Sequence, residues 1–158
     1  MQPLAAKVGA LLGEAVVRTE PVSGGDINSA YALTLQGGRK LFAKTHASAL
    51  PQMFVREAEG LRWLAEARAL RVPEVLAASE ADELGPACLV LEYIQPGGRG
   101  AAYAEAFGRG LAALHQSGAP SFGFATPNYL ASLPQDNTAH ASWPRFYAER
   151  RLLPLLAR

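Results

Sequence analysis

Apolar and polar positions along the first hundred residues predict a β-sheet, with one helix before it and another inside it. Leu4, Val8, Leu11 and Leu12 recur at helical spacing, so we expect an amphipathic helix over residues 3–12. Residues 53–70 carry a second apolar stripe, which Pro73 prevents from continuing. Apolar and β-branched runs predict five strands, over residues 15–22, 30–35, 41–43, 75–78 and 87–91.

The pattern changes after the last of these strands. Residues 87–91 are almost continuously apolar, which is typical of a strand buried on both faces, and the Pro/Gly-rich stretch 92–98 then indicates a hinge. Beyond the hinge we expect a helix over residues 101–117 and an irregular segment over residues 118–137. A last helix would be capped by Ser142, with Pro144 in its first turn and Pro154 bending or ending it.

Two glycine pairs frame the second predicted strand. Gly24 and Gly25 open a polar turn, and Gly37 and Gly38 are expected to close a tight primed hairpin turn in which both adopt positive φ. Lys44 follows the apolar run 41–43. Glycines let backbone N–H groups approach phosphate oxygens, and a lysine on the neighbouring strand adds a point charge. The layout favours a phosphate cradle over the alternatives, an ordinary hairpin turn and a surface lysine.

Composition narrows the class of protein. The 158 residues are 49% hydrophobic, enough for one domain or for one and a half lobes of something larger. A net charge of +1 with scattered arginines predicts no general attraction to nucleic acid. The single cysteine, Cys88, lies in an apolar run and is expected in the core, which fits a reducing compartment. No apolar run reaches the roughly eighteen residues of a membrane span, so we expect a cytoplasmic protein.

Short motifs then follow in a telling order: SGGDINSAY, FAK, MFVREAEGL, VPEVL, LVLEY, GRGLAALH, FGF, PQDN and WPRFYAERRL. Together they resemble the fructosamine kinase family, also called ketosamine 3-kinases, over about residues 21–153. PQDN and WPRFYAERRL are the family-specific pieces, whereas aminoglycoside and choline phosphotransferases share the earlier ones. The resemblance implies an α+β, protein-kinase-like fold. Residues 1–94 would be a small lobe, an antiparallel five-stranded sheet plus helix that binds nucleotide, and residues 95–158 the hinge and an incomplete helical large lobe.

The resemblance also implies a nucleotide site for ATP. Lys44 would contact the α- and β-phosphates and Glu57 would pair with it, although Glu59 is a weaker candidate and Glu57 could instead be a solvated helix residue. Glu92 and Ile94 would offer a backbone carbonyl and N–H to adenine. The phosphate-covering loop would comprise Gly24, Gly25, Asp26, Ile27 and Asn28.

On the sugar side of the cleft, the resemblance implies four candidates: Asn128, Gln135, Asn137 and Trp143. Gln135 and Asn137 have an alternative interpretation, because amides routinely satisfy backbone groups in loops. Arg150 and Arg151 are interpreted as a solvated or lobe-bridging face, and His115 as a structural residue near a helix C-terminus.

One departure from the family pattern matters. Family members carry a later HGDLWxGN-type segment and a metal-binding aspartate, which supply the catalytic base and magnesium ligands. The aspartates here are Asp26, Asp82 and Asp136, and none stands in such a motif. We therefore expect the magnesium ligands outside this chain, no metal site within it, and little activity from these 158 residues alone.

The expected function is ATP-dependent phosphorylation of the 3-hydroxyl of ketosamines, the sugar adducts on amines or protein lysines, as a deglycation step. The alternatives are phosphoryl transfer to another hydroxyl substrate, such as an aminoglycoside or choline, and a non-catalytic nucleotide-binding remnant. Expected partners are ATP, a ketosamine or glycated protein, and a second copy in a homo-oligomer, with neither nucleic acid nor membrane.

Overall fold

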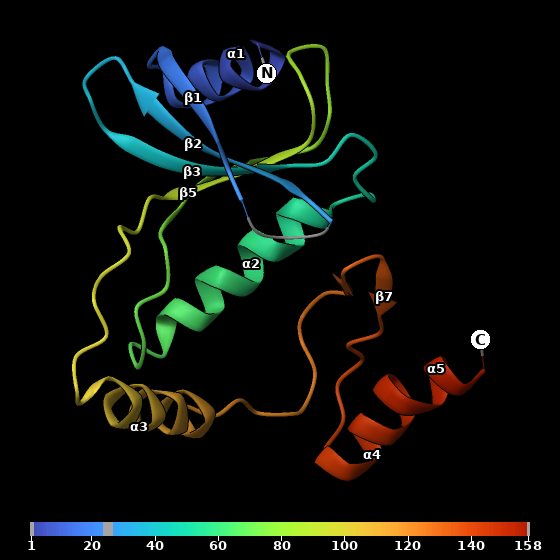
Figure 1. The fold of residues 1–158 in the computed structure, drawn as a ribbon. Coiled ribbons are helices and arrows are strands. Elements are labelled where there is room, and N and C mark those ends of the chain that lie inside the picture. Colours follow the sequence, from blue (N-terminus) through green and yellow to red (C-terminus); the bar gives the residue numbers. More distant parts are fainter. Residues whose placement is uncertain (1, 24–26, 158) are drawn as a thin grey trace. The chain divides into compact units, whose positions relative to one another are not determined.

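The computed structural model describes residues 2–23 and 27–157, and the chain divides into two compact units, Met1–Leu114 and His115–Arg158 (Figure 1). The first unit contains α1 (Gln2–Leu12), β1 (Val16–Val22), β2 (Ser29–Leu35), β3 (Lys40–Thr45), α2 (Met53–Glu66), β4 (Val75–Ser79), β5 (Cys88–Glu92) and most of α3 (Tyr103–Gln116). The second contains β6 (Asn128–Leu130), β7 (Leu133–Gln135), α4 (Trp143–Tyr147), a π-helical turn (Ala148–Leu152) and α5 (Leu153–Leu156). The expected division into lobes at residue 94 stays a prediction.

The first unit is built on a five-stranded antiparallel sheet in the order β1-β2-β3-β5-β4. The sheet and its five strands confirm the fold predicted from the apolar pattern. β5 lies between β3 and β4, and four of its five residues are buried, as its continuous apolar sequence predicted.

The two faces of this sheet carry different helices. Side chains alternate between the faces of a strand, so Leu41 and Ala43 face α1 whereas Phe42 faces α2. Figure 1 shows α1 and α2 on opposite sides of the sheet. The α1 side buries Leu4, Val8, Leu33, Leu35, Leu41, Ala43, Cys88 and Val90. The α2 side buries Phe54, Ala58, Ala87, Leu89 and Leu91. Each fully buried large apolar side chain stabilises the fold by roughly 1.5–3 kcal/mol.

Lys7 of α1 is buried, which the sequence pattern did not predict. It interrupts the apolar stripe, yet its side chain is fully buried. Its ammonium donates to the carbonyls of Glu80 and Gly85 and pairs with Asp82 Oδ1 at 3.0 Å. The hydrogen bond from Lys7 is the main reason that the pKa of Asp82 lies below its usual value. Lys7 therefore ties α1 to the turn between β4 and β5.

The hairpin between β2 and β3 differs from the tight primed turn that the glycine pair predicted. Gly38 has φ +84°, but Gly37 is not in the left-handed region. Gly38 N donates to the Leu35 carbonyl and Leu35 N to the Arg39 carbonyl, so the connection is longer than two residues. A single positive φ then suffices, as in a turn that ends in a bulge.

The helix ends also differ from the pattern. α2 ends at Glu66 rather than near residue 70, and the chain turns at Arg68, which has φ +50°. Ser142 occupies the N-cap position of α4 but makes no side-chain capping bond. Pro154 lies in the first turn of α5, after the π-helical turn, so it begins a new helical segment where we expected a bend or an end.

Residues 118–137 were expected to be irregular, and this is wrong for their second half. β6 and β7 form a short antiparallel hairpin that pairs Asn128 with Gln135. Strands of three residues are too short to show a period of two in the sequence, which explains the error. A second link in this unit joins Phe122 and His140 through reciprocal backbone hydrogen bonds.

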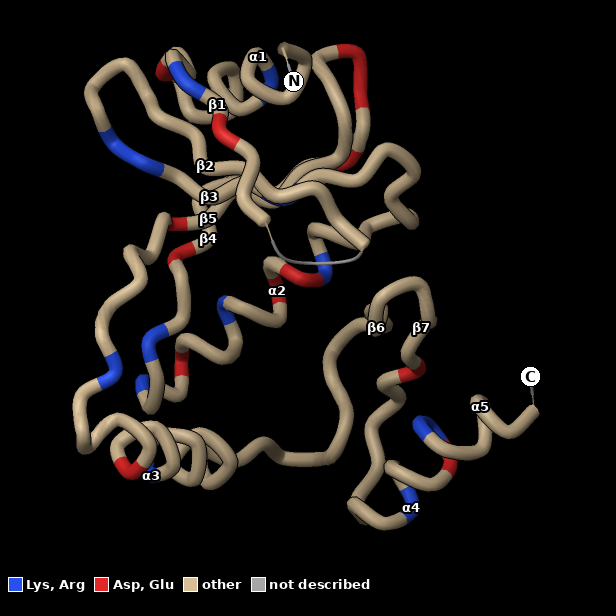
Figure 2. Tube along the Cα trace, in the orientation of Figure 1, with Lys and Arg blue, Asp and Glu red and all other residues tan. Residues whose placement is uncertain are grey.

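Among residues 2–23 and 27–157, no helix is long and apolar enough to cross a membrane. Basic and acidic residues are both scattered along the tube of the first unit (Figure 2).

Candidate functional site

An ion pair joins Lys44 of β3 to Glu57 of α2. Lys44 Nζ lies 2.7 Å from Glu57 Oε1, with 25% and 34% of the two side chains exposed. The alternation of β3 places Lys44 on the α2 face, because Ala43 packs on the opposite face. Glu57 follows Phe54 by three residues, so it lies on the helix face that packs against the sheet. The pair therefore follows from the two-residue alternation of β3 and the helical period of α2, which place Lys44 and Glu57 on faces that pack together.

Glu59 was the competing partner, and the structure gives it another cation. Arg56 Nη1 donates to both carboxylate oxygens of Glu59 at 3.0 Å. This pair lies along one helix, at spacing i to i+3. Glu57 is therefore the glutamate that holds Lys44.

The strand register places the ends of β1 and β2, which flank the predicted phosphate loop, level with Lys44. Val22 pairs with Ala30, and Ala30 pairs with Lys44, so the three residues form one row across β1, β2 and β3. The connection between β1 and β2 leaves the sheet at this row. Directly opposed residues point to the same face, so the side chains of Val22 and Ala30 share a face of the sheet with Lys44.

Only part of that loop can be placed. Gly24, Gly25 and Asp26 lie outside the described residues. Ile27 is exposed, and Asn28 buries its Oδ1 atom without a hydrogen-bond partner among the residues that the structure describes. Buried amide groups normally have partners, and an amide offers both donors and an acceptor. The unpaired atom is an acceptor, which would take a hydrogen bond from a donor and not from a phosphate oxygen, so the phosphate role of Asn28 stays a prediction.

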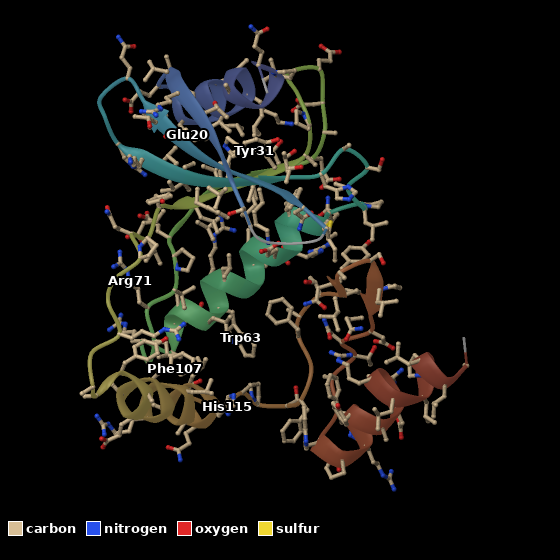
Figure 3. All side chains as sticks on the ribbon, in the orientation of Figure 1. Glu20, Tyr31, Trp63, Arg71, Phe107 and His115 are labelled. Carbon is tan, nitrogen blue, oxygen red and sulfur yellow. The ribbon has the colours of Figure 1, made fainter. Side chains whose placement is uncertain are left out.

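The predicted adenine contacts lie where β5 ends. The backbone N–H of Glu92 donates to the Glu74 carbonyl at 2.9 Å, and its carboxylate pairs with Arg71 (labelled in Figure 3) and accepts a bond from Glu74 N. The Arg71 bond is the main reason that the pKa of Glu92 lies below its usual value. These bonds hold the end of β5 against the start of β4. Ile94, two residues on, is half-buried.

The described residues contain no group of three or more His, Cys, Asp or Glu side chains placed to hold a metal ion.

The four sugar-side candidates belong to the second unit. Asn128 and Gln135 face each other across the β6–β7 hairpin, and both are half-buried. Asn137 is 4% exposed and donates through Nδ2 to Thr126 O and to Asn128 Oδ1, at 2.9 Å each. Trp143 is half exposed and contacts the rings of Phe122, Phe146 and Tyr147. A contact of these residues with substrate stays a prediction.

Arg150 and Arg151 bind neighbouring groups of the second unit, and the sequence interpretation, a solvated or lobe-bridging face, did not name these partners. Arg150 Nη1 donates to Asp136 Oδ2 at 2.7 Å. Arg151 donates to the Asp136 carbonyl at 2.7 Å and to Asn137 Oδ1. Bonds from Thr138, with Arg150 as a further cause, lower the pKa of Asp136, and burial lowers the pKa of Arg151. In the sequence, the only indication of these contacts was that PQDN and WPRFYAERRL, which contain the residues involved, are specific to the family.

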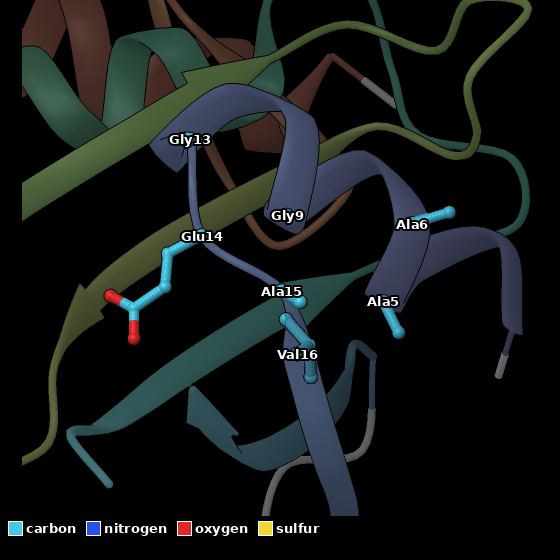
Figure 4. Close-up of a pocket in the computed structure, with 7 residues that line it drawn as sticks. All are labelled: Ala5, Ala6, Gly9, Gly13, Glu14, Ala15 and Val16. Carbon is cyan, nitrogen blue, oxygen red and sulfur yellow. The ribbon is translucent and has the colours of Figure 1, made fainter. Parts of the chain in front are cut away.

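A shallow pocket lies elsewhere in the first unit, between α1 and the start of β1. Figure 4 shows that small residues and Glu14 line it. Glu14 is engaged, because its Oε1 accepts a bond from Gly37 N at 2.6 Å. None of the predicted site residues lines this pocket.

A five-stranded antiparallel sheet, a strand lysine held by a helix glutamate and an extended exit after β5 define the small lobe of a protein-kinase-like fold. The sequence profile of the fructosamine kinase family matches residues 2–158, so the chain belongs to the fructosamine kinase family.

Individual relatives agree with this family. The chain is 39% identical to protein-ribulosamine 3-kinase of Arabidopsis thaliana, across 87% of this chain and 42% of that protein. It is also 39% identical to a Synechocystis protein named "Probable ketoamine kinase", across 83% and 44%. A crystal structure described as a candidate fructosamine-3-kinase of Thermobifida fusca superimposes with a TM-score of 0.86 at 35% identity, across 99% of this chain and 54% of that one. The chain thus spans about half the length of the relatives it matches.

Proposed function

We propose that the protein is an ATP-dependent kinase that phosphorylates the 3-hydroxyl of ketosamines carried on amines or protein lysines. The observation that carries this proposal is the Lys44–Glu57 pair at 2.7 Å, on a β-strand next to the predicted phosphate loop. Family membership and the printed names of the relatives support the substrate class. Because the 3-phosphate adduct is unstable and releases the amine, the reaction would be a deglycation repair step.

Phosphoryl transfer needs positioning and charge stabilisation more than covalent help from the protein. Lys44 would place a positive charge against the α- and β-phosphates, and Glu57 would keep its side chain extended towards them. Ile27 and Asn28 would cover the phosphates, and the backbone of Glu92 and Ile94 would bind adenine. Bound ATP supplies the phosphoryl group and magnesium neutralises its charge.

The residues that would take the proton from the substrate hydroxyl and hold magnesium are absent from the motifs of this chain. We propose that they lie in the half of the relatives that the chain does not match, and that these 158 residues alone transfer phosphate poorly. The buried, unpaired Cys88 fits a reducing compartment, and we place the protein in the cytoplasm.

The test is a pair of substitutions on one strand, made in the full-length protein. Lys44→Met should lower kcat/KM about 100-fold or more, as removal of one preorganised charge-stabilising group does. Lys40→Met is the matched control, because Lys40 lies on the same strand, outside this pair and exposed. We expect it to leave kcat/KM within about two-fold, since exposed charges act weakly. Near-normal turnover of a folded Lys44→Met protein would refute the proposal for Lys44.

Substrate class is tested separately. Labelled ATP offered in parallel with a fructosyl-lysine, a ribulosyl-lysine, an aminoglycoside and choline should give phosphate transfer to the ketosamines. Transfer to the aminoglycoside or choline alone would assign the protein to another branch of the fold. Nucleotide binding without transfer to any of the four would favour a non-catalytic module.

A further inference from the structure

The side chain of Glu92 takes a place that the backbone normally fills in an antiparallel sheet. Opposed residues of a hydrogen-bonded antiparallel pair exchange two bonds, one in each direction between their N–H and carbonyl groups. Glu92 and Glu74 make the first of these bonds, since Glu92 N donates to the Glu74 carbonyl at 2.9 Å. The return bond from Glu74 N goes instead to the carboxylate of Glu92, at an N···O distance of 3.4 Å.

This substitution leaves the backbone carbonyl of Glu92 to another donor. The N–H and the carbonyl of one residue in an antiparallel strand point to the same side, so this carbonyl faces the segment that precedes β4. The residue before Glu74 in that segment is Pro73, which has no N–H to donate. A carbonyl that meets no backbone donor is satisfied by water, a side chain or a ligand. The end of β5 therefore presents a backbone acceptor to a ligand.

Arg71 holds the carboxylate of Glu92 in this place. Its Nη2 atom donates to Glu92 Oε1, while Glu74 N bonds the other oxygen, Oε2. A carboxylate accepts on both oxygens, so the two bonds form together and fix the direction of the group. The bond from Arg71 is also the main reason that the pKa of Glu92 is lowered, which keeps the carboxylate charged at neutral pH.

The position of this carbonyl suits the base of a nucleotide. Glu92 pairs with Leu41 of β3, and Lys44 lies three residues further along the same strand, roughly 10 Å away at the usual rise per residue. A nucleoside spans a similar length between its base and its phosphates. Adenine carries an exocyclic amine that donates, whereas guanine has an oxygen acceptor at the same ring position. A backbone carbonyl therefore favours adenine over guanine.

We infer that Arg71 is a positioning residue for the nucleotide base and acts through the carboxylate of Glu92. Arg71 holds the carboxylate on Glu74 N, and the Glu92 carbonyl then accepts a hydrogen bond from the exocyclic amine of adenine. This inference rests on the proposed ATP-dependent kinase function, and it gives a role to two side chains where the motifs implied only a backbone contact. All the residues involved belong to the first unit.

The role of the carboxylate is tested with Glu92→Ala in the full-length protein, with Glu92→Gln as the conservative variant. Alanine leaves Glu74 N to bond the Glu92 carbonyl, so we expect the Kd for ATP to rise about ten-fold, the effect of one lost hydrogen bond to a ligand. Glutamine keeps an oxygen acceptor for Glu74 N, so its Kd should stay within about three-fold of the wild-type value. An unchanged Kd in Glu92→Ala, or equal losses in both variants, would overturn the role of the carboxylate.

The role of Arg71 is tested with Arg71→Gln, and Arg18→Gln is the matched control. The two arginines are similarly exposed, at 66% and 68%, and Arg18 also pairs with a glutamate, Glu20 of β1. β1 and β4 form opposite edges of the sheet. We expect Arg71→Gln to raise the Kd for ATP about five-fold and Arg18→Gln to change it less than about two-fold, since an exposed ion pair by itself contributes little. Equal Kd values in the two variants, measured by isothermal titration calorimetry, would overturn the positioning role.

A nucleotide without the exocyclic amine separates positioning from folding. Purine riboside triphosphate differs from ATP only in this amine, so it should bind wild type, Glu92→Ala and Arg71→Gln with Kd values within about two-fold of one another. A structural role for Arg71 would weaken the binding of both nucleotides equally or lower the melting temperature alone, and either result would overturn the inference. A wild-type protein that binds neither nucleotide would refute the proposed kinase function itself, a result distinct from a wild type that binds ATP and is insensitive to Arg71→Gln.

Discussion

Each of the two units of this chain is stabilised internally by a different kind of interaction. In the first unit, five paired strands form the sheet, and a cluster of buried apolar side chains covers each of its faces. Among its described buried residues, polar contacts such as the pair of Lys7 with Asp82 are few. In the second, Phe146 and Asn137 are the buried side chains among its described residues, and arginine and amide groups make the long-range contacts. The difference shows that the Lys44–Glu57 pair lies in a unit stabilised by apolar packing, whereas the second unit depends on directed hydrogen bonds.

The comparison predicts that loss of apolar volume harms the first unit most. Phe54→Ala removes a fully buried ring between α2 and the sheet, and we expect a loss of about 3–5 kcal/mol in the free energy of unfolding. Leu156→Ala in α5 is the control, because that side chain is 81% exposed, and it should change the free energy by less than about 0.5 kcal/mol. Urea unfolding followed by circular dichroism measures both. Equal losses of unfolding free energy in the two variants would contradict the proposed difference between the two units.

The polar exception within the first unit should have a smaller effect. Lys7→Met keeps the length of the side chain but removes its bonds to the carbonyls of Glu80 and Gly85, which keep Ser79 Oγ and Asp82 N as donors. We therefore expect a loss of about 0.5–1.5 kcal/mol in the free energy of unfolding. Hydrogen exchange should then increase in α1 and in the turn after β4 more than in β3. Protection that stays unchanged in α1 would show that the apolar face alone anchors this helix.

Acid should produce the smallest effect, and in the second unit this effect should depend on Asp136. The folded pKa of Asp136 is lowered, chiefly by bonds from Thr138, below its ordinary value of 3.8. A lowered pKa means that the folded state favours the carboxylate, so this stability is present above the ordinary value and is lost as the pH falls through the folded pKa.

Asp136→Asn removes that dependence, so its melting temperature should fall less than that of the wild type between pH 5 and pH 3. The pKa values of Asp82 and Glu92 are lowered too, so both proteins keep a background slope in the same direction. Parallel melting curves for the two proteins across this range would show that the loop at residue 136 contributes nothing to acid sensitivity.

The apolar pattern determined the sheet and the faces of its strands. The run before Lys44 and the stripe containing Phe54 and Ala58 each have a fixed period, so the buried face of each element follows from its sequence. The resemblance named Glu57 ahead of Glu59 as the partner of Lys44, and the structure shows Lys44 paired with Glu57 and Glu59 paired with Arg56. The phosphate, adenine and sugar roles of the site residues stay predictions.

Other features had no local signal. Lys7 is an ordinary polar residue in the sequence, and its burial depends on carbonyls 73 and 78 residues away. The three-residue strands of the hairpin carry too few positions for a period to be detected. The bonds from Arg151 to Asp136 and Asn137 join positions fourteen and fifteen residues apart through side-chain direction alone.

By itself, the sequence determined the order of the helices and strands of the first unit and membership of the fructosamine kinase family. The tertiary structure decided which charges are paired and which amides are already engaged, as in the contacts of Lys7, Glu57 and Asn137. The physical reason is that hydrophobic burial is non-directional and follows the local period, whereas a hydrogen bond requires two distant groups to meet at a set distance and angle.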